Sequence, residues 1–259
     1  MKLMHKAGIV SILGVKVSTI EIEPLLELIV RAIQDAKKIR VMYANVYALN
    51  LAYRDPAFRE QLNHSDVTFC DGYGVKWAGR FLGEIIPQRF TLPDWISLLC
   101  QQCVTRGFSI FLLGARPGVT DKAAARLLKD FPSLKIVGTY HGYFNKNACS
   151  LENKELLRMI NSARPNILIV GFGMPLQEQW VEDNYQNISA DVILTAGALF
   201  DVLSGEIKRA PKWMTDHGLE WFGRLIYEPR RLWRRYLIGN PVFIWRIVKQ
   251  RLGILHLER

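Results

Sequence analysis

Three glycine-containing loops follow apolar segments of the strand type, and they are the first candidates for a ligand site. Their sequences are Asp71-Gly72-Tyr73-Gly74, Gly114-Ala115-Arg116-Pro117-Gly118 and Gly171-Phe172-Gly173-Met174-Pro175. In open α/β sheets, ligands bind at the carboxyl ends of the strands, where helix N-termini present free N–H groups to phosphates. A single loop of this kind is typical of a tight turn, but three at strand ends favour a phosphate-containing ligand.

The third loop resembles only part of the dinucleotide fingerprint G-x-G-x-x-G. Its sixth position is Leu176, and no acidic residue closes the next predicted strand. Both features are needed to hold the pyrophosphate and the ribose of a dinucleotide. The sequence therefore gives little support to a nicotinamide cofactor, and we expect no cofactor of any kind.

Asp71 is the carboxylate whose position most suits catalysis. It ends an apolar segment and stands between Cys70 and Gly72. Burial at such a place raises the pKa of a carboxyl group toward the range of a general base. An aspartate before a glycine also commonly builds a turn, and spacing alone does not decide between the two interpretations.

Metal binding is not expected from the cysteine, histidine and aspartate pattern. The single C-x-x-C, Cys100 to Cys103, lies in a predicted helix, and the five histidines are scattered. Zinc sites need a second pair of ligands at a suitable spacing, so buried thiols are the better interpretation. The chain also lacks an Asp-x-Asp sequence, the usual carboxylate cluster for a divalent metal on a nucleotide diphosphate.

Composition limits the classes of protein that fit. The chain has 259 residues, of which 49% are hydrophobic and 22% charged, and this excludes a disordered protein. The formal net charge of +10 favours a polyanionic partner: nucleic acid, an anionic membrane or a phosphorylated substrate. Four cysteines suit a reducing compartment. Neither a signal peptide nor a spanning helix is indicated, so we expect a cytoplasmic protein.

Alternating apolar and amphipathic segments predict the fold. Strands are expected at 8–20 (a pair), 39–46, 67–70, 108–113, 134–140, 167–170 and 192–195, and helices at 24–38, 55–64, 93–106, 117–131, 151–163 and 175–184. Asp55 and Pro56 are typical of a helix start. Wholly apolar strands separated by helices indicate a Rossmann-like α/β fold, with a parallel sheet covered on both faces.

The last part of the chain differs in composition from the rest. We expect an α/β catalytic core over 1–204 and a basic, helical appendage over 205–259, broken by Pro229 and Pro241. Arginines and tryptophans alternate in it, at Trp213, Trp221, Arg224, Arg230, Arg231, Trp233, Arg234, Arg235, Trp245, Arg246 and Arg251. A plain solvated face is the simplest interpretation, but the dense tryptophan favours an interfacial surface for a membrane or a phosphate. No nucleic-acid recognition fold is indicated.

Taken together, these residues resemble the WecG/TagA/CpsF family of bacterial glycosyltransferases over about residues 9–238. The strongest matches are YANVYALN, which contains Asn45, CDGYGV, which contains Asp71, and GFGMPLQEQW over 171–180. The string GALFDVLSGEIKRAPKWMTDHGLEWFGRLIYEPRRLWRRY is a longer and more specific match.

The resemblance implies an inverting, metal-independent hexosyltransferase that moves a sugar from a UDP-sugar donor to a polyprenyl-diphosphate-linked sugar. Such an enzyme serves cell-surface polysaccharide synthesis as a peripheral protein at the inner face of the plasma membrane. By motif position, Asp71 resembles the general base of the family, Asn45 and Gln177 its polar active-site residues, and Arg89 its active-site arginine. Arg224, Arg231 and Arg234 resemble the arginines that reach the lipid diphosphate, while Arg246 and Arg251 are expected only to attract the membrane. Gly114, Gly171 and Gly173 are expected to line the donor site.

Some alternatives stay open. Tyr43 stands where family members that use N-acetylmannosamine commonly have threonine, so the donor sugar is of that type or another hexose. The rival functions are another nucleotide-dependent enzyme on a similar sheet, such as an oxidoreductase or hydrolase, and a non-enzymatic membrane-surface binding protein. The oligomeric state, a homo-oligomer included, is not decided.

Overall fold

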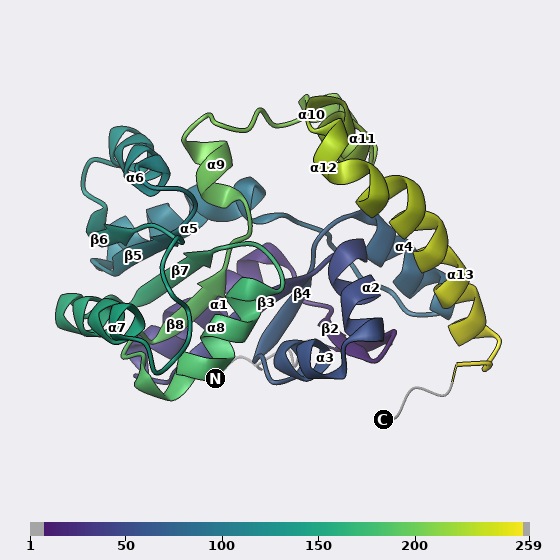
Figure 1. The fold of residues 1–259 in the computed structure, drawn as a ribbon, viewed down its shortest axis with the longest axis horizontal. Coiled ribbons are helices and arrows are strands. Elements are labelled where there is room, and N and C mark those ends of the chain that lie inside the picture. Colours follow the sequence, from purple (N-terminus) through teal and green to yellow (C-terminus); the bar gives the residue numbers. More distant parts are fainter. Residues whose placement is uncertain (1–7, 256–259) are drawn as a thin grey trace. The chain divides into compact units, whose positions relative to one another are not determined.

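The strands form one mixed sheet that is mostly parallel. The computed structural model describes residues 8–255, apart from the side chains of Lys212 and Asp216. Within these residues the sheet has eight strands in the order β1-β2-β4-β3-β8-β7-β5-β6 (Figure 1). β1 pairs antiparallel with β2, whereas β2–β4, β3–β8, β8–β7, β7–β5 and β5–β6 are parallel. The predicted α/β class and the predicted parallel sheet are confirmed.

The chain divides into two compact units, each described here by itself. Unit 1 contains residues 8–24, 43–91 and 209–255 of the described chain, and unit 2 contains 25–42 and 92–208. The strand β3 (Ile39–Ala44) and the helix α1 (Ile22–Gln34) run from one unit into the other. The division of the chain into a catalytic core, 1–204, and an appendage, 205–259, stays a prediction. The two compact units are a separate, structural division.

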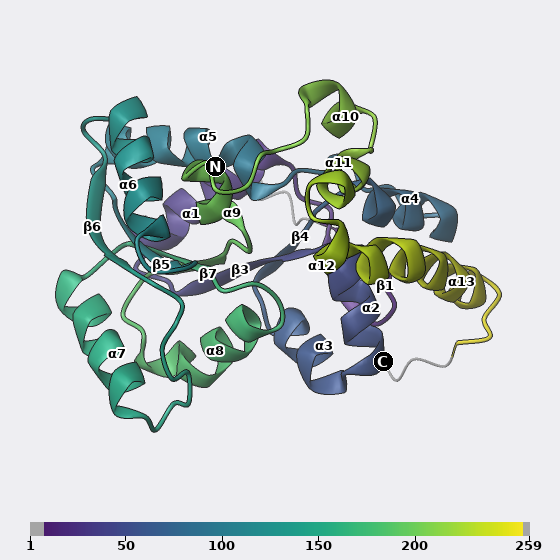
Figure 2. The ribbon, with the colours of Figure 1, turned by 45° about the horizontal axis from the view of Figure 1, so that its top comes forward.

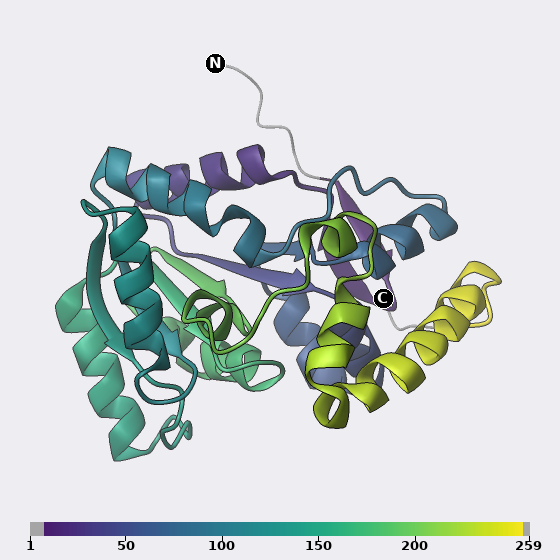
Figure 3. The same ribbon diagram turned by 90° about the horizontal axis from the view of Figure 1, so that it is seen from above.

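Unit 2 is built from strands that are almost wholly buried, apart from the edge strand β6, and from helices on both faces. Its further elements are α5 (Leu92–Arg106), β5 (Ser109–Gly114), α6 (Val119–Asp130), β6 (Lys135–Tyr140), α7 (Leu151–Ala163), β7 (Ile167–Gly171), α8 (Leu176–Asn184), a 3-10 turn (Tyr185–Asn187), β8 (Val192–Thr195) and α9 (Leu199–Leu203). α1 and α5 cover one face of its strands and α7 the other (Figure 3). Double coverage explains why β7 and β8 are apolar at every position but Gly171 and Thr195.

Unit 1 combines the antiparallel end of the sheet with the C-terminal helices. Its elements are β1 (Ile9–Ile12), β2 (Val15–Ser18), α2 (Val46–Arg54), α3 (Pro56–Asn63), β4 (Val67–Cys70), α4 (Tyr73–Leu82), α10 (Lys212–Asp216), α11 (Glu220–Tyr227), α12 (Pro229–Trp233), a π-helical segment (Arg234–Ile238) and α13 (Gly239–Arg251). Asp55 caps α3 by accepting a hydrogen bond from the Phe58 N–H, with Pro56 in the first turn, as the sequence predicts.

The C-terminal helices are part of the packed structure of unit 1. α13 lies alongside α2 and α4 (Figures 1 and 2), and it buries Phe243 and Ile247. The predicted break at Pro241 is wrong, because the chain is helical without interruption from Pro229 to Arg251. Proline is tolerated there because it lies in the first turn of α13, directly after the π-helical segment.

Arg246 does not have the membrane role expected from its charge. Its side chain is only 8% exposed, and its Nη1 donates to the backbone oxygen of Asn50 at 3.1 Å and to Asn50 Oδ1 at 2.7 Å. The guanidinium also lies over the Tyr53 ring, 4.1 Å from its centroid. Arg246 therefore attaches α13 to α2, and the sequence gives no sign of this because a buried arginine and a solvated one share the same helical spacing.

Candidate active site

The side chain of Asn45 is oriented by the helix that it begins. Asn45 follows β3 directly and caps α2, where its Oδ1 accepts a hydrogen bond from the Ala48 N–H at 3.0 Å. Because Oδ1 is used in this way, the amide nitrogen must point the other way. It donates to Asp71 Oδ2 at 3.1 Å. The cap therefore places an N–H donor against the candidate base.

The backbone holds Asp71 beside Asn45. The Asp71 N–H donates to the Ala44 carbonyl at 2.9 Å, which joins the ends of β4 and β3 within unit 1. Gly72 follows with φ +99°, a conformation that side chains other than glycine rarely adopt, and it begins α4. The predicted strand 67–70 and the Gly72 turn thus bring the aspartate to the carboxyl end of the parallel strands, as the Asp-Gly pair indicates.

Burial raises the pKa of Asp71 to about 6, well above the ordinary value for an aspartate. The hydrogen bond from Asn45 opposes this shift, because it stabilises the charged carboxylate. Glu220 raises the pKa further, while the positive charges of Arg235 and Arg224 lower it. A carboxyl group that titrates near pH 6 is ionised at neutral pH and is still basic enough to take a proton from a hydroxyl in a transition state.

Arg89 lies in the same unit and joins the loop before α5 to the first C-terminal helices. Its Nη2 donates to the Thr215 carbonyl at 2.9 Å, and its guanidinium lies over the Tyr73 ring, 4.6 Å from the centroid. Beside it, Arg209 pairs with Glu220 at 3.6 Å. In this arrangement Arg89 supports the segment that brings Glu220 and Arg224 toward Asp71, and direct contact with substrate stays a prediction.

The three appendage arginines named from the sequence lie on α11, α12 and the π-helical segment. Arg224 is half-buried and close enough to lower the pKa of Asp71, whereas Arg231 and Arg234 are exposed. Arg231 Nε donates to Glu228 Oε2 at 2.6 Å, and Arg234 lies over the Trp233 ring at 5.2 Å. The structure therefore brings Arg224 together with Asp71 and leaves the other two facing solvent.

The sequence analysis missed Arg235 as a site residue. Its guanidinium stacks 4.4 Å from the centroid of the Tyr47 ring on α2, and its charge lowers the pKa of Asp71. Arg231 and Arg235 are four residues apart, the spacing of one helix face, and this spacing could have identified Arg235. Arg224 lies on a separate helix, because α11 ends at Tyr227 and α12 begins at Pro229, where the sequence predicts a break.

In unit 2, the glycines at the strand ends allow two backbones to meet. A Cβ on Gly114 would lie 2.3 Å from the Gly171 carbonyl oxygen, so no side chain fits there. The Ala115 N–H donates to that same oxygen at 3.0 Å. Gly114 is thus required for the close approach of the ends of β5 and β7, whereas a Cβ on Gly171 would lie 2.9 Å from the Gly197 carbonyl oxygen after β8. Their predicted contact with the donor is a separate matter that this packing does not decide.

Gln177 connects the loops after β7 and β8. Its side chain is fully buried, and its Oε1 accepts from the Gly173 N–H at 3.2 Å and from the Gly197 N–H at 3.0 Å. Its Nε2 donates to Glu178 Oε1 at 2.7 Å. These two glycine N–H groups therefore serve Gln177 and are not free for a phosphate in this conformation. Burial raises the pKa of Glu178 to about 7, which favours a neutral carboxyl beside Gln177 at slightly acidic pH.

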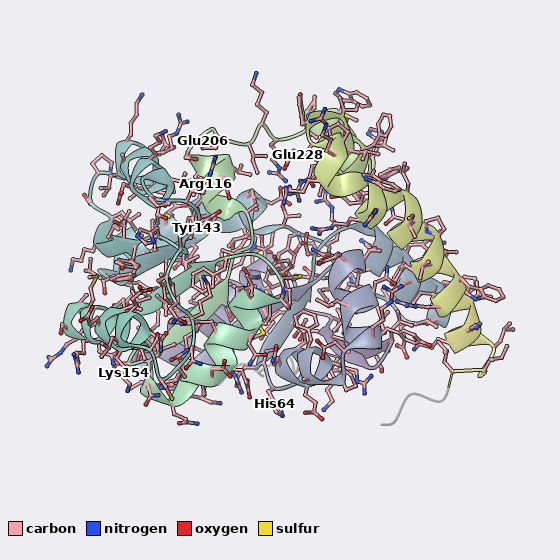
Figure 4. All side chains as sticks on the ribbon, in the orientation of Figure 1. His64, Arg116, Tyr143, Lys154, Glu206 and Glu228 are labelled. Carbon is pink, nitrogen blue, oxygen red and sulfur yellow. The ribbon has the colours of Figure 1, made fainter. Side chains whose placement is uncertain are left out.

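The loop after β5 also carries positive charge. Arg116 Nη2 lies 3.2 Å from Glu206 Oε2, and Lys122 Nζ lies 2.9 Å from Glu206 Oε1. Arg116 and Glu206 face one another from the start of α6 and the segment after α9 (Figure 4). Because these ion pairs are exposed, each contributes little to stability.

Two cysteines of the predicted C-x-x-C lie inside the protein and not at a metal centre. Burial raises the pKa of both Cys100 and Cys103 to about 12, so they are buried thiols on α5, as predicted. In the described part of the chain, no three His, Cys, Asp or Glu side chains come together in a way that could hold a metal ion.

Within unit 1, a half-buried carboxylate with a raised pKa follows a parallel strand, and Arg224 and Arg235 are close enough to affect its charge. These features are typical of an enzyme active site. A sequence model of the glycosyl transferase WecG/TagA/CpsF family matches residues 10–256. The chain therefore belongs to this family of glycosyltransferases. This membership favours a transferase over the oxidoreductase, hydrolase and non-enzymatic alternatives.

Curated relatives of the chain carry a more specific name. The N-acetylglucosaminyldiphosphoundecaprenol N-acetyl-beta-D-mannosaminyltransferase of Bacillus subtilis (strain 168) is 30% identical over 200 residues, which cover 77% of this chain and 75% of the relative. The enzyme of the same name from Staphylococcus aureus (strain NCTC 8325 / PS 47) is 26% identical over 221 residues, 85% of this chain and 84% of the relative.

Proposed function

We propose that this glycosyltransferase moves a hexose, N-acetylmannosamine or a related sugar, from a UDP-sugar to a polyprenyl-diphosphate-linked sugar, with inversion and without a metal. The relatives support the acceptor, because their name specifies N-acetylglucosamine on undecaprenyl diphosphate. The observation that carries the proposal is the pair of Asn45 and Asp71, in which a half-buried carboxylate with a pKa of about 6 is held by an oriented amide.

In this reaction Asp71 acts on the acceptor hydroxyl. The carboxylate takes the hydroxyl proton while the hydroxyl oxygen forms a bond to the anomeric carbon of the donor sugar. The bond between that carbon and the diphosphate oxygen breaks, and UDP leaves with the bonding electron pair. Asn45 keeps Asp71 ionised and fixes its orientation, since its N–H stabilises the charged form.

The positive charge of the C-terminal segment suits a diphosphate acceptor at a membrane. Arg224, Arg231 and Arg234 can each place a guanidinium fork on phosphate oxygens. Among the residues that the structure describes, no helix has both the length and the apolar character needed to cross a bilayer. We place the enzyme at the inner face of the plasma membrane as a peripheral protein, where cytoplasmic UDP-sugars meet the lipid-linked acceptor.

The test is a panel of UDP-sugars offered to the full chain with a short-chain lipid-diphosphate-N-acetylglucosamine acceptor, followed by UDP release and product mass. Release of UDP that requires the acceptor, with a product one hexose heavier, is the expected result. UDP release without glycosylated product would indicate a hydrolase and would overturn the proposal.

The pH dependence of kcat/KM should follow the ionisation of Asp71. Because the base must be ionised, kcat/KM should be constant above about pH 7 and should fall about tenfold per pH unit below pH 6. Glu220→Gln removes a charge that raises the pKa of Asp71, so this substitution should move the acidic limb to lower pH. A limb that stays in place in Glu220→Gln, or that lies near pH 4 in the unsubstituted enzyme, would contradict the assigned environment of Asp71.

Activity should not depend on a divalent metal. The chain has no Asp-x-Asp sequence, and arginines supply positive charge near Asp71. Turnover should therefore change less than about twofold after dialysis against EDTA, since the guanidinium of Arg235, which is not assigned to the acceptor, can neutralise the leaving diphosphate. Loss of turnover that Mn²⁺ or Mg²⁺ restores would show that a metal carries that charge.

A further inference from the structure

The helix α4 exposes a stripe of large apolar side chains immediately after the candidate base. Trp77 and Phe81 are 42% and 39% exposed, one helical turn apart, and their rings stack with centroids 5.3 Å apart. Ile85, in the loop after the helix, is 82% exposed. We call these three residues the α4 apolar stripe.

The outward position of the stripe is imposed by packing on the opposite side of α4. Val75, Ala78 and Gly79 are buried there, and a Cβ on Gly79 would lie 2.9 Å from Ile86 Cδ1. The absence of a side chain at Gly79 lets Ile86 pack beneath the helix, where it is buried. Successive residues of an extended loop point in opposite directions, so anchoring Ile86 inward directs Ile85 outward.

Positive charge accompanies the stripe. Arg80 is exposed on the same helix, and Arg251 at the end of α13 donates from Nη1 to the Leu82 carbonyl at 3.1 Å. Glu84 is the acidic residue of the same loop. The whole chain has a net charge of +10. Aromatic side chains flanked by arginine suit the boundary between the headgroups and the acyl chains of an anionic bilayer.

The helix that packs beside α4 also exposes large apolar side chains. α13 packs against α4 within unit 1 (Figure 2). Trp245 in the middle of α13 is exposed, and so are Leu252 and Ile254, which follow the helix. Scattered exposed apolar residues are ordinary, but several large ones on two adjacent elements mark an interaction surface. We propose that α4 is a second membrane-docking element, and that the α4 apolar stripe inserts into the surface of an anionic bilayer.

This inference rests on the proposed function, since it supplies a reason for the membrane position of the enzyme. Asp71 stands two residues before the start of α4. Insertion of the stripe would therefore hold the catalytic loop close to the bilayer surface, where the diphosphate of the acceptor lies. Docking by the C-terminal helices alone would leave that loop without its own membrane contact.

The experiment measures binding of the full chain to vesicles of phosphatidylglycerol and phosphatidylethanolamine by co-sedimentation. Ile85→Ser should weaken binding several-fold, and Trp77→Gln combined with Phe81→Gln should weaken it by about tenfold or more. The loss should persist in 0.5 M salt, because apolar insertion is not screened as charge is. Circular dichroism melting shows whether each variant is folded.

Leu151→Ser is the matched control, since Leu151 is 77% exposed on α7 of unit 2 and carries a similar side chain. It should leave vesicle binding unchanged. Equal binding by a folded Ile85→Ser protein and the unsubstituted protein would overturn the proposal, and so would variants that dissociate a dimer while vesicle binding stays the same. Turnover of a water-soluble acceptor by the unsubstituted enzyme tests the proposed function separately.

Discussion

Replacing Asp71 by asparagine is expected to lower kcat by about 10²–10⁴-fold, the usual value of a positioned proton transfer. The substitution keeps the shape of the side chain, and the new amide oxygen can still accept the Asn45 N–H that Asp71 Oδ2 accepts at 3.1 Å. The acidic limb of the pH profile should disappear with the carboxyl group. Steady-state kinetics with a saturating donor measures both effects.

The same substitution should not destabilise the fold at neutral pH. Burial raises the pKa of Asp71 to about 6, above its value in the unfolded chain. Between about pH 4 and pH 6 the folded protein therefore binds the proton more tightly, and stability falls as the pH rises through this window. Asparagine carries no charge to bury, so the melting temperature at pH 7.5 should equal or exceed that of the unsubstituted protein. Normal turnover in Asp71→Asn would remove Asp71 from the role of base.

The sequence predicts the parallel strands and most helices but misses α2 and α4, and the reason is physical. α4 contains Gly74 and Gly79, each of which lowers helix stability by about 1 kcal/mol relative to alanine. Tertiary packing outweighs this cost, because a Cβ at Gly74 would lie 2.4 Å from Val46 Cγ2. Gly74, which was expected in a loop, is the position where α4 approaches α2 closely, whereas Gly79 lets Ile86 pack against the helix. Asparagine is a favoured N-cap residue, so Asn45 could have predicted that a helix, α2, begins after it.

Some residues of the candidate site can be identified from the local sequence pattern, and others only from tertiary packing. Asp71 and Asn45 stand at strand ends that a local apolar pattern predicts, and the resemblance assigns their roles. Arg235 and Glu220 affect Asp71 only because the C-terminal segment packs back onto residues 43–91. The local sequence pattern does not predict this long-range packing. The buried role of Arg246 escaped prediction for the same reason, since its partner Asn50 lies 196 residues away.

The arginines of the C-terminal segment provide the second large expected effect. Arg224→Ala, Arg231→Ala and Arg234→Ala should each lower kcat/KM for the lipid-linked acceptor by about 10–100-fold, since a hydrogen bond to a charged group contributes about 1.5–3 kcal/mol. The affinity for UDP, measured by calorimetry, should change little. Arg231 donates to Glu228 at 2.6 Å and must give up this hydrogen bond to bind the acceptor. The loss of that hydrogen bond offsets part of the binding free energy that Arg231 contributes.

Arg230→Ala is the matched control for charge, because Arg230 is exposed on the same short helix as Arg231. Arg230→Ala should change kcat/KM for the acceptor less than about threefold. This difference should disappear in 0.5 M salt, since salt screens the attraction between an exposed charge and the acceptor. Arg246→Ala should behave in a third way, lowering the melting temperature through loss of its bonds to Asn50. If Arg230→Ala matches the effect of Arg231→Ala and Arg234→Ala, these arginines act by general attraction to an anionic surface and not by contact with the acceptor diphosphate.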